Sequence, residues 1–160
     1  MPRPQRPTRS YATDPLTRAV RVVALVGVAS IAVWLLLLYP ALPQRVPTHF
    51  DAGGTADAWG DKSNVLLLIA VFVVMSGAIA WLSTKPHWAN YPAAVTPSNA
   101  QRLYREAERM LAWLLVPIAV LFAGIALSQL SVPAAPLLLL GTGGLLAVTA
   151  IGVARLLRAA

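Results

Sequence analysis

The sequence predicts an all-α integral membrane protein: a bundle of four transmembrane helices with a small ordered extracytoplasmic loop cap between helices 1 and 2. Of the 160 residues, 58% are hydrophobic and 12% are charged, whereas soluble domains average about 45–50% and about 25%. The chain also contains uncharged stretches long enough to cross a bilayer, which takes about 17–25 residues of helix. Both observations argue against an ordinary soluble enzyme domain, because so few charges cannot cover a surface that faces water.

The positions of the charged residues define the predicted helices. Uncharged stretches run from 22 to 39 and from 65 to 84, and a longer one, from 110 to 154, has room for two spans. A polar segment with two prolines, 128–136, divides the longer stretch into a helical hairpin. We therefore expect a single transmembrane domain over residues 19–158. Its helices should lie at about 19–39, 63–84, 97–128 and 134–157.

Residues 1–18 should form a basic cytoplasmic tail that is disordered in isolation, since they contain four prolines, four arginines and no apolar period. Eleven of the 13 Lys and Arg residues lie in this tail, in the loop between the second and third helices, or near the carboxyl end. Basic loops stay in the cytoplasm, so both termini are expected there. The net charge of +7 is then a topology signal, and we expect membrane lipids rather than nucleic acid as partners.

The parts of these helices expected to lie within the membrane, in the stretches 22–39, 65–84 and 110–154, contain no Asp, Glu, Lys, Arg or His. Proton relays, voltage sensors and most ion pathways need ionisable groups at membrane depth, so the sequence argues against a pump or a proton-coupled transporter. Gly141, Gly144 and Gly152 predict close helix packing, either within the bundle or against a helix of another protein. Pro117 predicts a kink in the third helix.

The segment 40–63, between the first two helices, predicts a folded cap rather than a flexible spacer. Its three prolines disfavour helix and favour an extended path. Residues 46–50 and 55–59 fit two short strands. The residues between them, 51–54, contain a Gly-Gly pair that fits a tight turn.

Four side chains of this cap form a candidate metal set: His49, Asp51, Asp57 and Asp61. One imidazole and three carboxylates suit a divalent ion. The alternative is structural, with His49 hydrogen-bonded inside the cap, Asp51 initiating the turn and Asp61 capping the second helix. We expect the structural role, with no metal or other cofactor. Since the sequence shows no Ser/His/Asp spacing and no HExxH pattern, we also expect no enzymatic activity.

The cap resembles a known family signature. It contains Leu42-Pro43-x-x-Val46-Pro47-Thr48-His49-Phe50-Asp51, then Gly54, Asp57, Trp59, Gly60 and Lys62-Ser63. This run is similar to "LPxxIPxHFxxxGxxDxxGxKS" of the bacterial membrane family called domain of unknown function 1648. The resemblance extends to Asn90-Tyr91-Pro92 and Thr96-x-x-Asn99 and covers about residues 20–130. It implies a multi-pass bacterial plasma membrane protein related to SdpI-type proteins, which give immunity to a secreted antibacterial peptide and hold a transcriptional repressor at the membrane.

The loop from Lys85 to Met110 should contain the start of the third helix. Thr96 is a suitable N-cap and Pro97 a suitable first residue. Apolar residues then recur along one face, which predicts that the helix begins about two to three turns before the membrane. The opposite, solvated face should carry Gln101, Arg102, Arg105, Glu106, Glu108 and Arg109, with Arg102 and Glu106 as an i,i+4 pair.

We expect a non-enzymatic polytopic membrane protein that acts through protein contacts, with another membrane protein or a small peptide as its partner. Outer-loop contacts should come from His49, Phe50, Asp51, Asp57, Trp59 and Lys62. Cytoplasmic-loop contacts should come from Asn90, Tyr91, Asn99, Tyr104 and Arg105. Two alternatives stay open: an accessory or assembly subunit of a larger membrane protein complex, and a metal-dependent activity at the outer loop.

Overall fold

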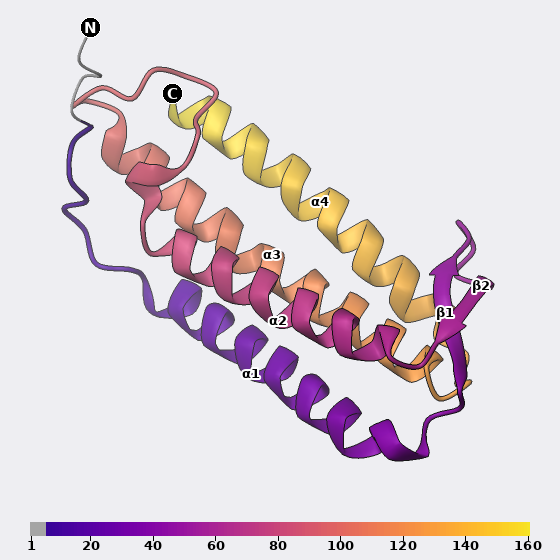
Figure 1. The fold of residues 1–160 in the computed structure, drawn as a ribbon. Helices are drawn as coiled ribbons and strands as arrows, with labels where there is room; N and C mark the ends of the chain where they lie inside the picture. Colours follow the sequence, from indigo (N-terminus) through magenta and orange to yellow (C-terminus); the bar gives the residue numbers. More distant parts are fainter. Residues whose placement is uncertain (1–5) are drawn as a thin grey trace, which may run out of the picture.

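The computed structural model describes residues 6–160 and contains four long helices and one β-hairpin (Figure 1). The helices are α1 (Pro15–Leu38), α2 (Asn64–Ser83), α3 (Ala100–Ser128) and α4 (Ala135–Ala159). Between α1 and α2 lie the strands β1 (Arg45–Phe50) and β2 (Ala56–Asp61), which pair antiparallel. Each long helix has the length and apolar composition needed to cross a membrane, so the predicted fold class is confirmed.

The two ends of the bundle differ in what they carry. The amino-terminal segment, the carboxyl end and the α2–α3 connection lie at one end, whereas the hairpin and the α3–α4 turn lie at the other (Figure 1). We call the first the arginine end, since it carries Arg9, Arg105 and Arg158, and the second the hairpin end. This arrangement follows from the up-down-up-down order of the four helices.

Helix α3 is the centre of the bundle. It packs against α4, α1 and α2, and α1 also packs against α2, whereas the extensive contacts of α4 are with α3. The main apolar core lies between α1, α2 and α3, where Leu35 and Phe122 are fully buried. The Phe72 ring stacks on the Phe122 ring with their centroids 4.5 Å apart. Because α3 has neighbours on opposite sides, it buries two faces rather than the single face of a peripheral helix.

Helix α1 begins four residues before the expected start at residue 19. The Asp14 carboxylate accepts hydrogen bonds from the Thr17 backbone N–H at 2.9 Å and from the Thr17 hydroxyl at 2.7 Å. Pro15 follows in the first helical position, where its missing N–H is no loss. Asp14 and Pro15 therefore begin the helix within residues 1–18, the segment that was predicted to be a disordered tail.

Helix α3 begins at Ala100 rather than at residue 97. Asn99 Oδ1 accepts a hydrogen bond from the Thr96 N–H at 2.8 Å, and Thr96 Oγ1 accepts one from the Asn99 N–H at 3.3 Å. This reciprocal pair has the geometry of a capping box. Thr96 therefore acts as a cap, as expected, but the turn that it closes precedes the regular helix.

The described part of the tail, residues 6–14, runs as an irregular segment along α3. The Gln101 side chain donates to the Thr8 carbonyl at 2.8 Å and accepts from the Ser10 N–H at 3.0 Å. The composition predicted disorder for this segment in isolation, and the folded chain supplies the partners that an isolated tail lacks. Residues 1–5 of the predicted tail lie outside the described residues.

Candidate functional site

The turn at residues 51–55 shapes the hairpin. Asp51 Oδ1 accepts hydrogen bonds from the backbone N–H groups of Gly53 at 2.9 Å and Thr55 at 2.8 Å. Gly54 has a φ of 80°, a left-handed conformation that glycine adopts without the steric penalty of a side chain. The predicted hairpin is confirmed, and its turn is built by local backbone hydrogen bonds to one carboxylate.

Contacts with several helices hold the hairpin on the bundle. Val46 is 1% exposed and belongs to the main apolar core. Gly54 lies so close to the start of α4 that a Cβ at this position would be 3.0 Å from the Cα of Ala135. The side-chain nitrogen of Gln129, at the end of α3, lies 3.4 Å from the Pro47 carbonyl oxygen. The cap is therefore a packed part of the fold.

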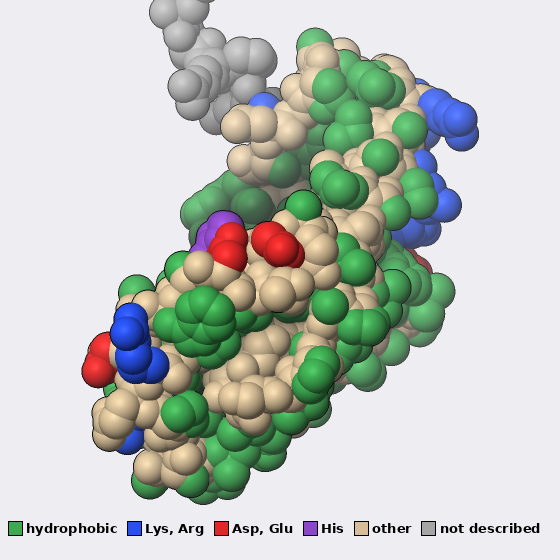
Figure 2. Space-filling model, turned by 90° about the vertical axis from the view of Figure 1, so that its right-hand side faces the viewer, with side chains coloured by type: hydrophobic (Ala, Val, Ile, Leu, Met, Phe, Trp, Pro, Cys, Tyr) green, Lys and Arg blue, Asp and Glu red, His purple; other side chains and the backbone are tan. Residues whose placement is uncertain are grey.

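The outward face of the cap carries a hydrogen-bonded histidine–aspartate pair and an aromatic side chain. His49 Nδ1 lies 2.6 Å from Asp57 Oδ1, and these side chains are 69% and 48% exposed. Trp59 is 51% exposed and pairs across the sheet with Pro47. Figure 2 looks onto this end and shows a histidine next to acidic side chains, with hydrophobic side chains nearby. Exposed tryptophan is enriched where proteins contact other molecules.

The other predicted outer-loop contacts lie deeper in the cap. Lys62 Nζ lies 5.2 Å from the centre of the Tyr39 ring, a cation–π contact at the base of the cap. Phe50, the last residue of β1, is half-buried. It lines a cleft of about 380 Å³ between the hairpin and the α3–α4 turn. Trp59 and Arg45 line the same cleft from the hairpin side, so aromatic, apolar and positively charged groups surround it.

Gln129 contributes to the lining of this cleft and is 1% exposed. Its Nε2 donates to the Ile125 carbonyl at 3.1 Å and to the Pro47 carbonyl at 3.4 Å, which sets the orientation of the amide. Its Oε1 is buried and has no hydrogen-bond partner among residues 6–160. An unpaired buried acceptor costs about 1–3 kcal/mol, and a donor that reached Oε1 would offset this cost. Gln129 was not among the predicted site residues. The feature of the sequence that could have identified it is its position as the one glutamine in the uncharged run of 45 residues from 110 to 154.

The candidate metal ligands are divided among separate interactions. Asp51 holds the turn, and His49 pairs with Asp57. Asp61 Oδ1 accepts from the Ser63 N–H at 2.8 Å, and this hydrogen bond lowers the pKa of Asp61. Within the part of the chain that the structure describes, no group of three or more His, Cys, Asp or Glu side chains could hold a metal ion.

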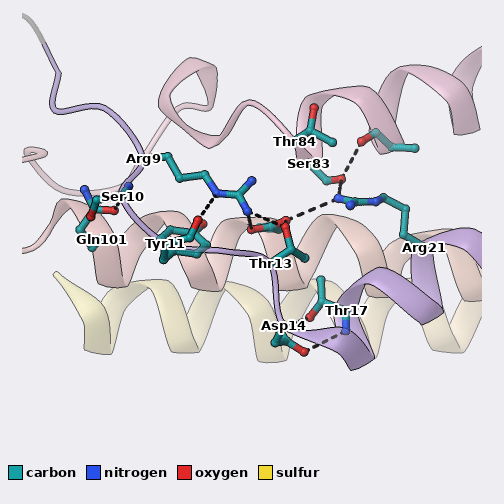
Figure 3. Close-up of polar contacts among 12 residues, drawn as sticks. Arg9, Ser10, Tyr11, Thr13, Asp14, Thr17, Arg21, Ser83, Thr84 and Gln101 are labelled. Atoms are coloured by element: carbon teal, nitrogen blue, oxygen red, sulfur yellow. Dashed lines mark hydrogen bonds and ion pairs between the residues drawn. The ribbon is translucent and has the colours of Figure 1, made fainter.

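A buried ion-pair cluster surrounds Glu108 of α3 at the arginine end. Figure 3 labels its partners Arg9, Thr13 and Arg21. Glu108 is 2% exposed, and its Oε1 accepts a hydrogen bond from the Thr13 hydroxyl at 2.6 Å. Arg21 lies 3.5 Å from Oε1, and Arg9 lies 3.6 Å from Oε2. The prediction that Glu108 lies on a solvated helix face is wrong, because the tail and α1 cover that side of α3.

The Glu108 cluster joins four parts of the chain. Arg21 of α1 also donates to the hydroxyl of the buried Ser83 of α2 at 3.0 Å. Tyr11 of the tail packs beside the cluster, and burial raises its pKa, with the negative charge of Glu108 as a further cause. Since one carboxylate holds arginines from the tail and from α1, the cluster fixes both segments on α3.

The predicted contact residues of the α2–α3 loop divide into buried and exposed groups. Asn99 and Tyr104 are 6% and 0% exposed, and their side chains donate to backbone carbonyls of this chain. Tyr91 is half-buried, its hydroxyl also donates to a carbonyl, and burial raises its pKa. Asn90 and Arg105 are exposed. Asn99 and Tyr91 therefore hold the loop in place, whereas Tyr104 binds the Pro7 carbonyl of the tail. Asn90 and Arg105 are accessible.

The predicted ion pair between Arg102 and Glu106 does not form. Instead, Glu106 Oε1 lies 2.9 Å from Arg109, and Glu106 Oε2 lies 3.8 Å from Arg155 of α4. Among the described residues, Arg102 takes part in no ion pair. Helix α4 lies beside α3 and supplies a cation that the i,i+4 spacing within α3 could not reveal.

The glycines predicted for helix packing lie on the side of α4 that faces α3. A Cβ on Gly141 would lie 2.8 Å from the Cβ of Leu121, and a Cβ on Gly144 would lie 2.9 Å from the Cβ of Pro117. Gly152 also lies against a side chain of α3. Small residues let helix backbones approach closely, so α3 of the same chain fills the space that these glycines leave.

Comparison with known proteins identifies a family segment and no established activity. Residues 25–74, which include most of α1, the hairpin and part of α2, match the family model described as Domain of unknown function (DUF1648). The resemblance noted in the cap is thereby confirmed. An uncharacterized protein of Archaeoglobus fulgidus is 37% identical over an alignment of 92 residues that covers 50% of this chain and 50% of that protein. The chain thus spans about half the length of this relative. No solved structure matches at a significant level.

Proposed function

We propose that this multi-pass membrane protein binds a peptide segment of a partner at its hairpin end. The whole hairpin lies within residues 25–74, the segment that matches the DUF1648 model. The proposed activity is recognition without a catalytic step. The resemblance of the cap to SdpI-type immunity and signalling proteins supports a secreted peptide as the partner. The concentration of arginine at the opposite end supports an orientation with the hairpin outside a bacterial plasma membrane and both termini in the cytoplasm.

The observation that carries this proposal is the unpaired Oε1 of Gln129 in the cleft. The amide is held by two carbonyls on its nitrogen side, so the oxygen cannot exchange places with the nitrogen without losing those hydrogen bonds. A donor from a bound molecule would remove the energetic penalty of the unpaired oxygen. The cleft lies between packed elements and exists without a ligand, which favours binding. A ligand reaches Oε1 after a small movement of the side chains that cover it.

The lining of the cleft favours a peptide ligand. An extended peptide presents backbone N–H groups, and one of these can donate to Gln129 Oε1. Phe50 and Trp59 offer apolar and aromatic surface to a side chain of the peptide. Arg45 lies at the same cleft and favours an acidic group. We therefore expect a peptide that presents an apolar side chain close to an acidic one.

Photo-crosslinking tests where the partner binds. Benzoylphenylalanine would replace Trp59 in one variant and Trp88, at the arginine end, in a matched control, since the two tryptophans are 51% and 59% exposed. We expect a discrete peptide adduct at position 59 and none at position 88. An adduct at position 88 without one at position 59 would contradict the proposal.

A substitution at the floor of the cleft tests the proposed hydrogen bond. Gln129→Leu keeps a similar volume and removes the acceptor, so the yield of the adduct at position 59 should fall about tenfold, as expected for one lost hydrogen bond. Ser128→Ala is the control, because the Ser128 hydroxyl donates to Gly124 in its own helix at 3.0 Å. Equal yields from the two variants would show that the cleft does not bind the peptide.

The alternative role as an accessory subunit is favoured by the exposed apolar surface of α4. Leu139, Leu140 and Leu146 of this helix are 52%, 63% and 70% exposed. Another membrane protein could cover these side chains, as lipid would. Crosslinkers placed at Leu140 and Leu146 distinguish the roles: a stoichiometric membrane protein captured there, with no adduct at position 59, would favour the subunit role.

A further inference from the structure

Two adjoining hollows open between helices at the arginine end. The first, which we call the arginine pocket, has a volume of about 530 Å³. Its charged lining consists of Arg102, Arg105, Arg109, Arg155, Arg158 and Glu106. The second, which we call the α1–α4 slot, has a volume of about 440 Å³ and lies between the start of α1 and the adjacent parts of α3 and α4. Glu106, Arg109 and Arg155 line both hollows, so a single molecule can occupy the two.

The arginine pocket has a large excess of positive charge. Its lining contains five guanidinium groups and one carboxylate, for a formal net charge of +4. The carboxylate, Glu106, pairs with Arg109 at 2.9 Å and with Arg155 at 3.8 Å. Within residues 6–160, neither Arg102 nor Arg158 is within ion-pair distance of a carboxylate. Like charges brought together in this way repel one another, and a bound anion would relieve that repulsion.

The α1–α4 slot continues from the arginine pocket into the apolar part of the bundle. Leu16 of α1, Trp113 of α3 and Ile151 of α4 line it, and they are 62%, 38% and 56% exposed. The slot exists because α1 and α4 both pack on α3, while the extensive contacts of α4 do not include α1. A hydrocarbon chain would cover these apolar side chains.

We propose that the arginine pocket and the α1–α4 slot together bind one anionic phospholipid. Its phosphate accepts hydrogen bonds from the guanidinium groups, whose planar geometry suits bidentate contact with phosphate oxygens. One acyl chain lies in the slot against Leu16, Trp113 and Ile151. Basic pockets between transmembrane helices are a recognised site for anionic headgroups. This site lies at the opposite end of the bundle from the peptide cleft, so it does not depend on the proposed function.

Binding of defined lipids to the delipidated full-length protein in detergent tests the ligand class. We would measure affinities by native mass spectrometry for phosphatidylglycerol and for phosphatidylcholine with the same acyl chains. Phosphatidylglycerol should bind at least about tenfold more tightly, since several arginines near a membrane surface each contribute about 1 kcal/mol to anionic lipid binding. Inorganic phosphate at equal concentration should not displace it. Equal affinities for the two lipids, or full displacement by inorganic phosphate, would overturn the proposal.

A charge-matched pair of variants distinguishes a site from diffuse surface charge. Arg102→Gln with Arg158→Gln removes two arginines of the pocket that are outside the Glu106 ion pairs. The control, Arg18→Gln with Lys85→Gln, removes two exposed positive charges that line neither hollow. Affinity for phosphatidylglycerol should fall at least about tenfold in the first variant and less than about twofold in the control. Equal losses would overturn the proposal.

A second pair of variants tests the place of the acyl chain. Ile151→Trp puts a large side chain into the slot and should lower the affinity for phosphatidylglycerol, whereas Leu146→Trp, on the same helix and outside both hollows, should not. If Ile151→Trp leaves the affinity unchanged, the arginines bind a headgroup without the slot, and the proposal fails.

Discussion

Buried polar side chains carry the specific chemistry of this apolar chain. Glu108 is surrounded by donors from other segments, so its burial is compensated. Gln129 is compensated on its nitrogen alone. A polar group buried without a partner destabilises the fold. Glu108 therefore has a structural role, whereas Gln129 is a candidate binding group.

Removing the charge of Glu108 should destabilise the bundle. In Glu108→Gln, the guanidinium groups of Arg9 and Arg21 keep their positive charge in a largely buried place and lose their carboxylate. We expect a loss of about 2 kcal/mol in the free energy of unfolding, measured by titration with a denaturing detergent. This is less than the loss of about 3–5 kcal/mol when a fully buried ion pair is broken, because both arginines are partly exposed. Glu106→Gln is the control: its partners Arg109 and Arg155 are 39% and 50% exposed, so its loss should stay below about 1 kcal/mol. Equal losses would contradict this assignment.

The cap of α1 should depend on pH. Hydrogen bonds from the hydroxyl and the backbone N–H of Thr17 lower the pKa of Asp14 below its usual value. The carboxylate therefore stabilises the fold above the unfolded pKa of about 3.9, and this contribution is lost as the pH falls through the lower folded pKa. At pH 7, Asp14→Ala should cost about 1 kcal/mol. As the pH falls through the lowered folded pKa of Asp14, the difference in unfolding midpoint between this variant and the native chain should shrink, whereas a constant difference would show that the charge of Asp14 does not matter.

At the scale of elements, the position of α3 between its neighbours explains the packing. One face of α3 meets α1 and the tail, and another meets α4 along a row of small residues. Close approach is needed on the α4 side because that helix has its extensive contacts with α3. The stability of α4 in the bundle should therefore depend on the residues at this single interface.

Two adjacent glycines of α4 provide a matched test of this interface. A side chain on Gly144 would meet the Cβ of Pro117 at 2.9 Å, whereas one on Gly143 would meet no atom within 4 Å. Gly144→Leu should separate α4 from α3 and lower the midpoint of thermal unfolding in detergent, with a destabilisation of about 1–3 kcal/mol from overpacking. Gly143→Leu should leave the midpoint unchanged or raise it, since leucine favours helix more than glycine does. The reverse order would show that α4 is rotated relative to this structure.

At the scale of the whole molecule, the charge difference between the ends predicts orientation. The arginine end carries both termini and most basic residues, and the hairpin end carries Arg45 and Lys62. By the positive-inside rule, we expect the hairpin to lie outside the cell. Both proposed sites depend on this arrangement in different ways: the peptide cleft would face the exterior, and the lipid site would face the cytoplasmic leaflet.

Labelling of introduced cysteines tests the orientation, and the native chain has no cysteine to give a background. Cysteines replacing Thr55 and Val132, both exposed at the hairpin end, should react in intact cells with a thiol reagent that cannot cross the membrane. A cysteine replacing the exposed Ser98, at the arginine end, should react after the membrane is permeabilised. Labelling of position 98 in intact cells would reverse the assignment.

By itself the sequence determined the four spans, their order and the hairpin, because apolar length, charge position and glycine turns are local properties of the chain. It also identified the resemblance to the DUF1648 family, although the family model matches residues 25–74 rather than the expected 20–130. The tertiary structure alone decided that Glu108 is buried, that Glu106 pairs with Arg155 rather than Arg102, and that Gln129 keeps an unpaired oxygen. In each case the outcome depends on which segment lies beside α3. Partners distant in sequence determine whether a buried polar group is compensated, and a local pattern does not contain that information.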